Sequence, residues 1–233
     1  MNRKHSIVLL LLLSASMICN AVLGMAAIRV YQKYNHVRTD PLGLLNETDT
    51  PEEGEYDYFL IGDSLIANWD IAGASVANEG IGAQTSGQVM YRMLLLGDTL
   101  HAKKSIICVG GNDLKILRFD TELSADILHT SLSNIREIIR LSKGIADQTY
   151  IVTIPPMYTV PFYMKPLKST QVMLSALEEL NQGILDVAAD EGVEVIDCET
   201  VLQGMNTEDV LAPDNVHLSE KAYEALFSEL QDD

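Results

Sequence analysis

The sequence predicts an α/β fold in which a five-stranded parallel sheet carries helices on both faces, preceded by an N-terminal apolar helix. Short runs of β-branched and aromatic residues alternate with longer runs in which apolar residues recur at helical spacing. Turns rich in glycine and polar residues follow several of the short runs directly. Such β-α alternation favours parallel strands that bury both faces of their sheet under helices.

The expected strands are short, and helical patterns separate the later ones. The strands cover residues 56–61, 74–77, 105–109, 150–154 and 193–196. Helices are expected around two apolar stripes, Leu123, Ile127, Leu128, Leu132, Ile135, Ile138 and Ile139, then Val172, Leu177, Leu180, Ile184 and Val187, and again over 220–230. Ligands of open α/β sheets bind at the carboxyl ends of the strands, so polar residues just after the strands are the functional candidates.

The first 30 residues predict a membrane anchor. Residues 6–28 carry no charge and follow Arg3 and Lys4. A secretory signal usually has an apolar core of ~7–15 residues, whereas ~20 residues suffice to cross a bilayer as a helix. We therefore expect residues 1–30 to form an uncleaved, single-pass anchor in the cell membrane with an extracytoplasmic folded domain. A cleaved signal peptide and a secreted protein are the alternative.

The rest of the chain divides into a linker and one domain. Residues 31–55 are polar and acidic and contain Pro41 and Pro51, which suits a solvated linker. Residues 56–233 are of a length that fits one well-buried domain. Nothing in the pattern predicts an oligomeric state.

Charge and cysteine content narrow the function classes. Beyond residue 30 the chain has 13 Lys and Arg against 33 Asp and Glu, and such a domain repels phosphate backbones, so nucleic acid is not expected as a partner. Cys19, Cys108 and Cys198 form no Cys-x-x-C pair and have no histidine at metal-ligand spacing. We interpret them as small apolar residues and assign no disulfide, metal or cofactor.

The turn after the first strand, Gly-Asp-Ser-Leu at 62–65, contains the candidate nucleophile. A serine there, Ser64, stands where the next helix begins, and free N–H groups at that position favour developing negative charge. The alternative is that Asp63 or Ser64 only caps the helix.

Two further turns offer donors for an oxyanion. Gly80, in Asn-Glu-Gly-Ile-Gly at 78–82, lets a backbone N–H approach a substrate closely. Asn112, in Gly-Gly-Asn-Asp at 110–113, offers a side-chain amide. Each motif alone is equally compatible with an ordinary turn.

The last motif, Asp-Asn-Val-His at 214–217, supplies a base and a residue to orient it. Two intervening residues allow Asp214 to accept from the Nδ1–H of His217, which leaves the other ring nitrogen for Ser64. A surface Asp and His near a helix start is the alternative. Together the four motifs, in chain order, complete one reaction centre at one edge of the predicted sheet.

These four motifs resemble those of the SGNH hydrolases, also called the GDSL esterase/lipase family, over roughly residues 56–230. The resemblance implies a flavodoxin-like three-layer α/β/α sandwich without cofactor. It also implies a Ser64, His217 and Asp214 triad, with Ser64, Gly80 and Asn112 as oxyanion donors. In many relatives the second motif ends in a glycine where this chain has Ala83.

The expected activity is hydrolysis of acyl esters. An α/β-hydrolase is excluded because its Gly-x-Ser-x-Gly elbow would need a glycine at Ile66. With the anchor, this favours a short-chain or carbohydrate O-acetyl esterase at the cell envelope, acting on small-molecule or glycan esters. Lipid esters for a lipase or lysophospholipase, an acyltransferase, and a non-catalytic binding module are the alternatives. Trp69 is a candidate for stacking on a sugar, and the apolar segment 155–168 for binding an acyl chain, covering the site or packing.

Overall fold

The computed structural model describes residues 3–44, 51–96, 100–157, 160 and 164–230. The chain forms two compact units, Met1–Asn46 and Glu47–Asp233.

The first unit is a single long helix, α1 (Arg3–Thr39). Its stretch from His5 to Thr39 is long and apolar enough to cross a membrane, and the mean hydropathy of an 18-residue window within it is 2.4. The helix continues beyond the expected anchor, 1–30, into the segment expected as a linker. That extension contains no glycine or proline, and Pro41 follows its end. His36 and Arg38 lie in its last turn, where a positive charge interacts favourably with the helix dipole.

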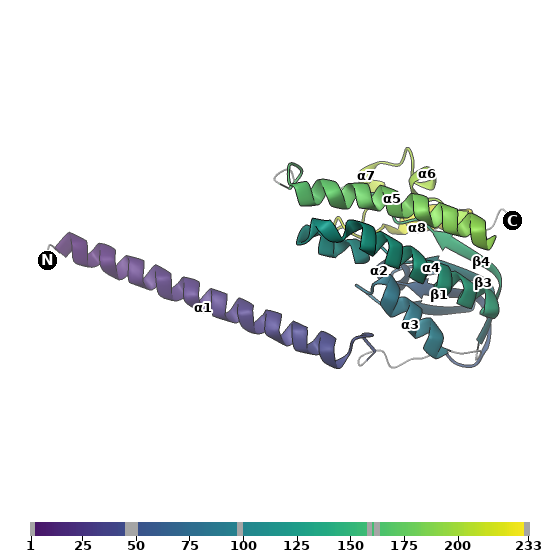
Figure 1. The fold of residues 1–233 in the computed structure, drawn as a ribbon, viewed down its shortest axis with the longest axis horizontal. Helices are drawn as coiled ribbons and strands as arrows, with labels where there is room; N and C mark the ends of the chain where they lie inside the picture. Colours follow the sequence, from purple (N-terminus) through teal and green to yellow (C-terminus); the bar gives the residue numbers. More distant parts are fainter. Residues whose placement is uncertain (1–2, 45–50, 97–99, 158–159, 161–163, 231–233) are drawn as a thin grey trace. The chain divides into compact units, whose positions relative to one another are not determined.

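The second unit contains the predicted five-stranded parallel sheet, in the order β2-β1-β3-β4-β5 (Figure 1). The strands are β1 (Gly54–Gly62), β2 (Val76–Gly80), β3 (Leu100–Cys108), β4 (Ala146–Val152) and β5 (Glu194–Ile196). The order moves outward from β1 in both directions, which is the pattern of a doubly wound α/β sheet. The fold class expected from the sequence is confirmed.

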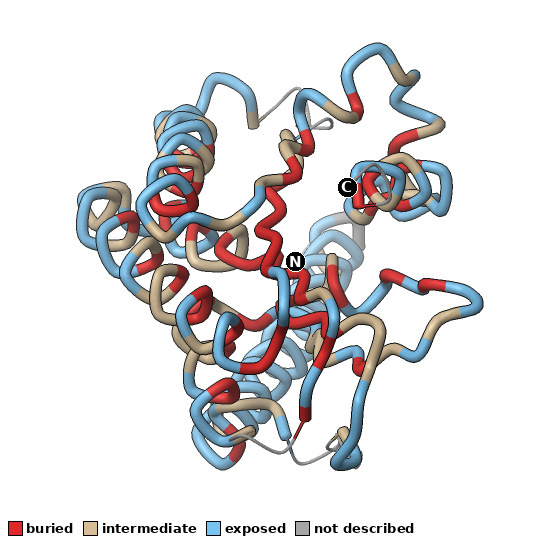
Figure 2. Tube along the Cα trace, turned by 90° about the vertical axis from the view of Figure 1, so that its right-hand side faces the viewer, coloured by how far each residue is buried: buried red, intermediate tan, exposed pale blue. Residues whose placement is uncertain are grey.

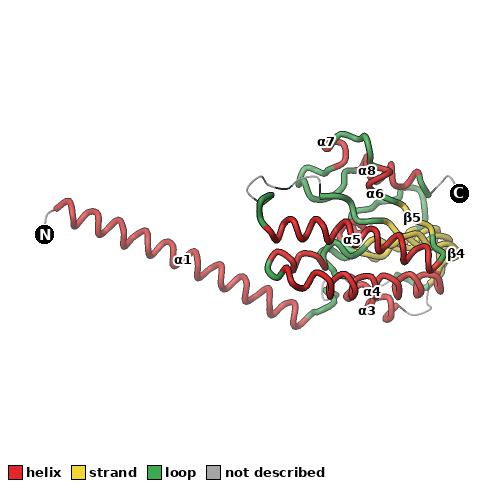
Figure 3. Tube along the Cα trace, turned by 45° about the horizontal axis from the view of Figure 1, so that its top comes forward, coloured by secondary structure: helices red, strands yellow, loops and turns green. Residues whose placement is uncertain are grey.

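Helices cover both faces of this sheet. They are α2 (Ser64–Ala67), α3 (Ser86–Leu96), the 3-10 turns η1 (Asp113–Arg118) and η2 (Thr121–Leu123), α4 (Ser124–Ile145), α5 (Lys168–Glu191), α6 (Cys198–Val201), α7 (Thr207–Val210) and α8 (Glu220–Ser228). Helices α3, α4 and α5 lie side by side along one face (Figures 1 and 3). Helix α8 packs on the other face, where Phe227 meets Tyr58 edge to face and Lys104 donates to the carbonyl of Leu230.

The core lies between the sheet and these two helical layers. In Figure 2 the buried segments run through the centre of the unit, and the exposed ones lie outside. Fully buried side chains come from the strands and from the apolar stripe of α4 that the sequence predicted; they include Phe59, Leu60, Ile61, Ile106, Ile107, Ile135, Ile138, Ile139 and Ile151. Cys108 and Cys198 are buried free thiols, as expected of small core residues.

The register of the central strands brings three loops to one edge. Gly62 pairs with Gly80 on one side and with Cys108 on the other. The turns that follow β1, β2 and β3 therefore begin at the same height in the sheet. This edge is where the candidate site has to be sought.

Candidate active site at the carboxyl edge of the sheet

Ser64 is the first residue of α2 and is partly buried. The cap of this helix is Asp63, whose Oδ1 accepts a hydrogen bond of 2.9 Å from the amide of Leu65. The two interpretations of the first motif are therefore compatible, because Asp63 caps the helix and leaves the hydroxyl of Ser64 for another role.

Asp63 is more than a cap. Its side chain is buried, and its Oδ2 accepts a bond of 3.0 Å from the amide of Asn112. Burial raises the pKa of Asp63 to about 6, while the Leu65 amide, the charge of Lys115 and that of His217 act in the opposite direction. The effect of His217 on the pKa of Asp63 indicates that the last motif lies near the first. Sequence reasoning treated Asp63 only as a capping residue.

Gly80 serves close packing between β2 and α2. A Cβ built on Gly80 would lie 2.1 Å from the backbone nitrogen of Ala67, so only glycine fits there without movement. The amide of Gly80 donates to Oδ1 of Asn78 at 2.9 Å. The N–H expected to face an oxyanion is thus already bonded within its own loop.

Gly82, two residues after Gly80 in this loop, lies near Ser64. A Cβ built on Gly82 would lie 3.9 Å from the Cβ of Ser64. Ala83 follows with φ +66, a left-handed conformation that favours glycine. Within the described part of the chain, the amides of Gly82 and Ala83 donate to no protein group. The sequence offered one signal for the unusual backbone at Ala83, because many relatives have a glycine at this position.

Asn112 lies at the end of the loop after β3, with both hydrogens of its amide in use. One is donated to Asp63 and the other to the carbonyl of Gln84, at 2.8 Å. The next residue, Asp113, accepts from the amide of Ser86 at 2.9 Å, its hydroxyl at 2.6 Å, and the hydroxyl of Ser131 at 3.0 Å. These bonds attach the Asn112 loop to α3 and α4.

Asp214 and His217 interact as the sequence predicted. Nδ1 of His217 lies 2.6 Å from Oδ2 of Asp214, while Oδ1 accepts from the amides of Val216 and His217, each at 3.0 Å. The backbone bond from His217 lowers the pKa of Asp214 most, and with the ring and Val216 bonds brings it to about 2. The turn is closed by the antiparallel pairing of Leu211 with Leu218. Asp214 is therefore anionic at neutral pH and orients the imidazole.

Helix α8, which follows this turn, is bonded to the segment of α2, the helix that begins at Ser64. The hydroxyl of Tyr223 donates to the carbonyl of Leu65 at 2.7 Å, and its ring packs on Trp69 with centroids 5.3 Å apart. Trp69 is only 3% exposed, so the expectation that it stacks on a sugar is wrong. No hydrogen bond joins Ser64 to His217 among the described residues.

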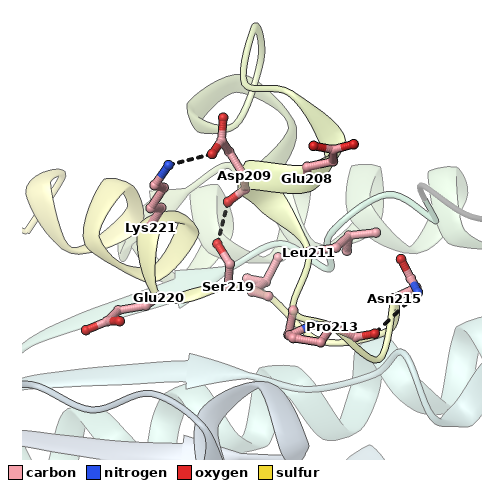
Figure 4. A pocket seen from close by; sticks show the side chains of 10 residues that line it. Glu208, Asp209, Leu211, Pro213, Asn215, Ser219, Glu220 and Lys221 are labelled. Atoms are coloured by element: carbon pink, nitrogen blue, oxygen red, sulfur yellow. Dashed lines mark hydrogen bonds and ion pairs between the residues drawn. The ribbon is translucent and has the colours of Figure 1, made fainter.

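A pocket of about 540 Å³ opens beside the His217 turn (Figure 4). Leu211, Pro213 and Asn215 line it from the turn itself, and an ion pair of 2.6 Å between Asp209 and Lys221 crosses its other side. Neither Ser64 nor His217 lines it. In the described ranges no three His, Cys, Asp or Glu side chains are grouped as a metal site requires.

The apolar segment 155–168 is described only in part. Met157 and Leu167 are exposed, while 158–159 and 161–163 lie outside the described residues. The three interpretations of this segment therefore stay predictions.

Sequence reasoning missed Arg92, a buried arginine on α3 that donates to Gly62, Glu79 and Gln84. A signal was present. Arg92 follows Val89 by three residues and so continues the apolar stripe of its helix, where a charged side chain needs partners.

The family model of the GDSL-like lipase/acylhydrolase family matches residues 60–225. No curated protein matches the chain. Among solved structures, the chain is similar to a Streptococcus pneumonia protein provisionally described as a platelet activating factor, at 18% identity and a TM-score of 0.58, over 89% of this chain and 98% of that one. It is also similar to a GDSL-like lipase from Bacteroides thetaiotaomicron, at 18% identity and 0.55, over 85% and 95%.

An acetylxylan esterase from Geobacillus stearothermophilus is similar at 14% identity and a TM-score of 0.56, over 78% of this chain and 95% of that one. Alanine variants of one histidine and one serine of that esterase are described as catalytic mutants. At these identities the likeness shows a shared fold.

Proposed function

Because the chain belongs to the GDSL-like lipase/acylhydrolase family, we propose that it is a serine esterase with Ser64 as nucleophile, His217 as general base and Asp214 as the orienting carboxylate. The observation that carries the proposal is the 2.6 Å contact between Nδ1 of His217 and Oδ2 of Asp214. The catalytic serine and histidine of the acetylxylan esterase give independent support for the same chemistry.

In the proposed reaction, His217 removes the proton from Ser64 as its Oγ attacks the ester carbonyl. The tetrahedral intermediate collapses when His217 protonates the leaving alcohol, which yields an acyl-enzyme on Ser64. Water, deprotonated by His217, then releases the acid. Asp214 keeps Nδ1 protonated, so Nε2 is the nitrogen that carries out both transfers. The ring approaches Ser64 by a side-chain movement when the ester binds.

The oxyanion donors proposed from this geometry are the amides of Ser64 and Ala83 and the side chain of Asn112. Ala83 takes the role expected of Gly80, since the amide of Gly80 is bonded to Asn78, whereas Ala83 follows Gly82, which lies near Ser64. Asn112 keeps its bond to Asp63 and redirects toward the oxyanion the hydrogen now donated to Gln84. Removing one such donor typically lowers kcat about 10²–10³-fold, which is the loss expected for Asn112→Ala.

We propose short acyl esters, including O-acetyl groups on carbohydrate, as the substrate class. The structural likeness to an acetylxylan esterase supports this choice. The long apolar helix α1 supports attachment to a membrane, which would place the activity at the cell envelope. If α1 anchors the protein, the full chain stays in the membrane fraction after an alkaline wash. Release of a chain lacking its first 30 residues would indicate a signal peptide instead.

An aryl ester series tests the function directly. We expect rapid hydrolysis of the acetyl ester and much slower hydrolysis of esters with eight or more carbons in the acyl chain. Ser64→Ala should lose both turnover and labelling by a serine-directed fluorophosphonate. Turnover retained in Ser64→Ala would refute the nucleophile, and a preference for long chains would favour a lipase. Absence of hydrolysis and of labelling in the wild type would leave a binding module.

A further inference from the structure

Arg92 is a buried cation that the proposed reaction does not use directly. It lies on α3 between Val89 and Met93 and is 3% exposed. A guanidinium cannot lose its charge at any ordinary pH, so its burial requires acceptors on every side. The groups that accept hydrogen bonds from Arg92 therefore indicate its structural role.

Its acceptors belong to two segments of the active site. Nε donates to Oε1 of Gln84 at 2.8 Å, and Nη1 to Oε2 of Glu79 at 3.1 Å. Nη2 donates to the carbonyl of Glu79 at 2.7 Å and to that of Gly62 at 3.3 Å. One planar group thus holds the start and the end of loop 79–84 and the last residue of β1.

Every oxyanion donor lies close to one of these attachment points. Gly62 precedes Ser64 by two residues in the chain. The stretch between Glu79 and Gln84 contains Ala83, and the carbonyl of Gln84 accepts from Asn112. The same carbonyl of Gly62 that accepts from Arg92 also accepts from the amide of Ile81, at 3.1 Å.

We propose that Arg92 is a positioning residue that sets the oxyanion donors of this loop relative to Ser64. The proposal rests on the proposed esterase function. Arginine suits this role because its five N–H groups are fixed in one plane, so the distances among its acceptors are fixed as well. A lysine at this position carries the charge but can neither reach all four acceptors nor fix their spacing.

Arg92→Lys tests the proposal, with Arg136→Lys as its matched control. Arg136 also joins two segments through two carboxylates, Asp190 and Glu191, but does so between α4 and α5 on the outer surface. Misplacing catalytic groups by about 1 Å can cost about 10²-fold. We expect Arg92→Lys to lower kcat for the acetyl ester about 10–100-fold per fluorophosphonate-titrated site, with KM within about twofold. Arg136→Lys should keep wild-type kcat.

A second variant separates positioning from simple stabilisation. Replacing a buried ion pair by apolar residues of similar volume is often neutral for stability, whereas breaking it is not. The double variant Arg92→Met with Glu79→Met leaves no unpaired carboxylate, so it should be more stable than Arg92→Met alone, although the carbonyls of Gly62 and Glu79 and the side chain of Gln84 lose a donor. It should still show the reduced kcat. If kcat returns to the wild-type value in this variant, Arg92 only stabilises the fold and the positioning role is refuted.

Amide hydrogen exchange provides a readout that does not depend on activity. Arg92→Lys should speed exchange at Ile81 and at the Asn112 side chain, while the ring N–H resonance of His217 stays unchanged. Unchanged exchange together with unchanged kcat would refute the proposal. If the wild type proves inactive on every ester, the proposed function fails, and faster exchange at Ile81 still supports Arg92 as the residue that positions the loop.

Discussion

Replacing Asp63 by Asn removes a buried carboxyl group whose ionisation opposes folding. The ordinary pKa of this side chain is 3.8, and burial raises it to about 6 in the folded protein. The folded state therefore binds more protons than the unfolded state between these values. The free energy of unfolding should accordingly fall as pH rises through this window, the opposite of the usual case for an aspartate.

The size of this effect follows from the two pKa values. A difference of about two units corresponds to about 3 kcal/mol, at 1.36 kcal/mol per unit. Linkage places about 2 kcal/mol of this between pH 4.5 and 7. Asparagine also turns an N–H₂ group toward the amide of Asn112, but that cost does not depend on pH. The prediction therefore concerns only how the difference in free energy of unfolding between wild type and Asp63→Asn changes with pH.

Urea unfolding of both proteins at intervals from pH 4.5 to 7 measures this slope. The wild type should lose about 2 kcal/mol relative to Asp63→Asn across the range. Asp209 gives a control of opposite sign, because the hydrogen bond from Lys221 lowers its pKa and its contribution is lost as pH falls. Parallel stability curves for wild type and Asp63→Asn would show that Asp63 keeps one charge state throughout, and would refute the reasoning.

Three further substitutions near the site, and Gly144→Ala on α4 as a control, test local packing by urea unfolding. Gly80→Ala should destabilise the fold by at least about 3 kcal/mol, because its Cβ would lie 2.1 Å from a backbone nitrogen of α2. Gly144→Ala has nothing within 4 Å of the added Cβ and should stabilise α4 by about 1 kcal/mol. Equal effects of the two substitutions on stability would contradict the close approach at Gly80. Ala83→Gly should relieve a left-handed φ of +66 and stabilise the fold by up to about 1 kcal/mol, and a loss of stability would argue against that strain. Tyr223→Phe keeps the ring but leaves the carbonyl of Leu65 without its donor, and should cost about 1–2 kcal/mol; no cost would mean that water replaces the hydroxyl.

The fold was predictable because its signals are local. Alternating β-branched runs and helical stripes define the strands and α4, and three of the four motifs lie at the ends of β1, β2 and β3. The pairing of Asp214 with His217 was predictable for the same reason, since both lie on one short turn. The extension of α1 to Thr39 was missed, although its composition suits a helix.

The hydrogen-bond partners of Asn112 were not predictable, because they come from other segments of the chain. The sequence alone places Asn112 in a turn, but it does not show that Gln84 and Asp63 occupy its amide. The bond from the amide of Gly80 to Asn78 is local, but it was not expected either. The burial of Trp69 was unpredictable in the same way, since its partner, Tyr223, lies on the last helix.

The sequence by itself determined the order of the four motifs along the chain, the residue types available for chemistry and the apolar character of the first segment. These properties depend on composition and short-range periodicity. Only the tertiary structure decided that Gly82 lies near Ser64, that Asp63 and Gln84 accept from Asn112, and that Arg92 joins loop 79–84 to β1. Each of these depends on distances between segments far apart in the chain, which the packing of helices on the sheet sets.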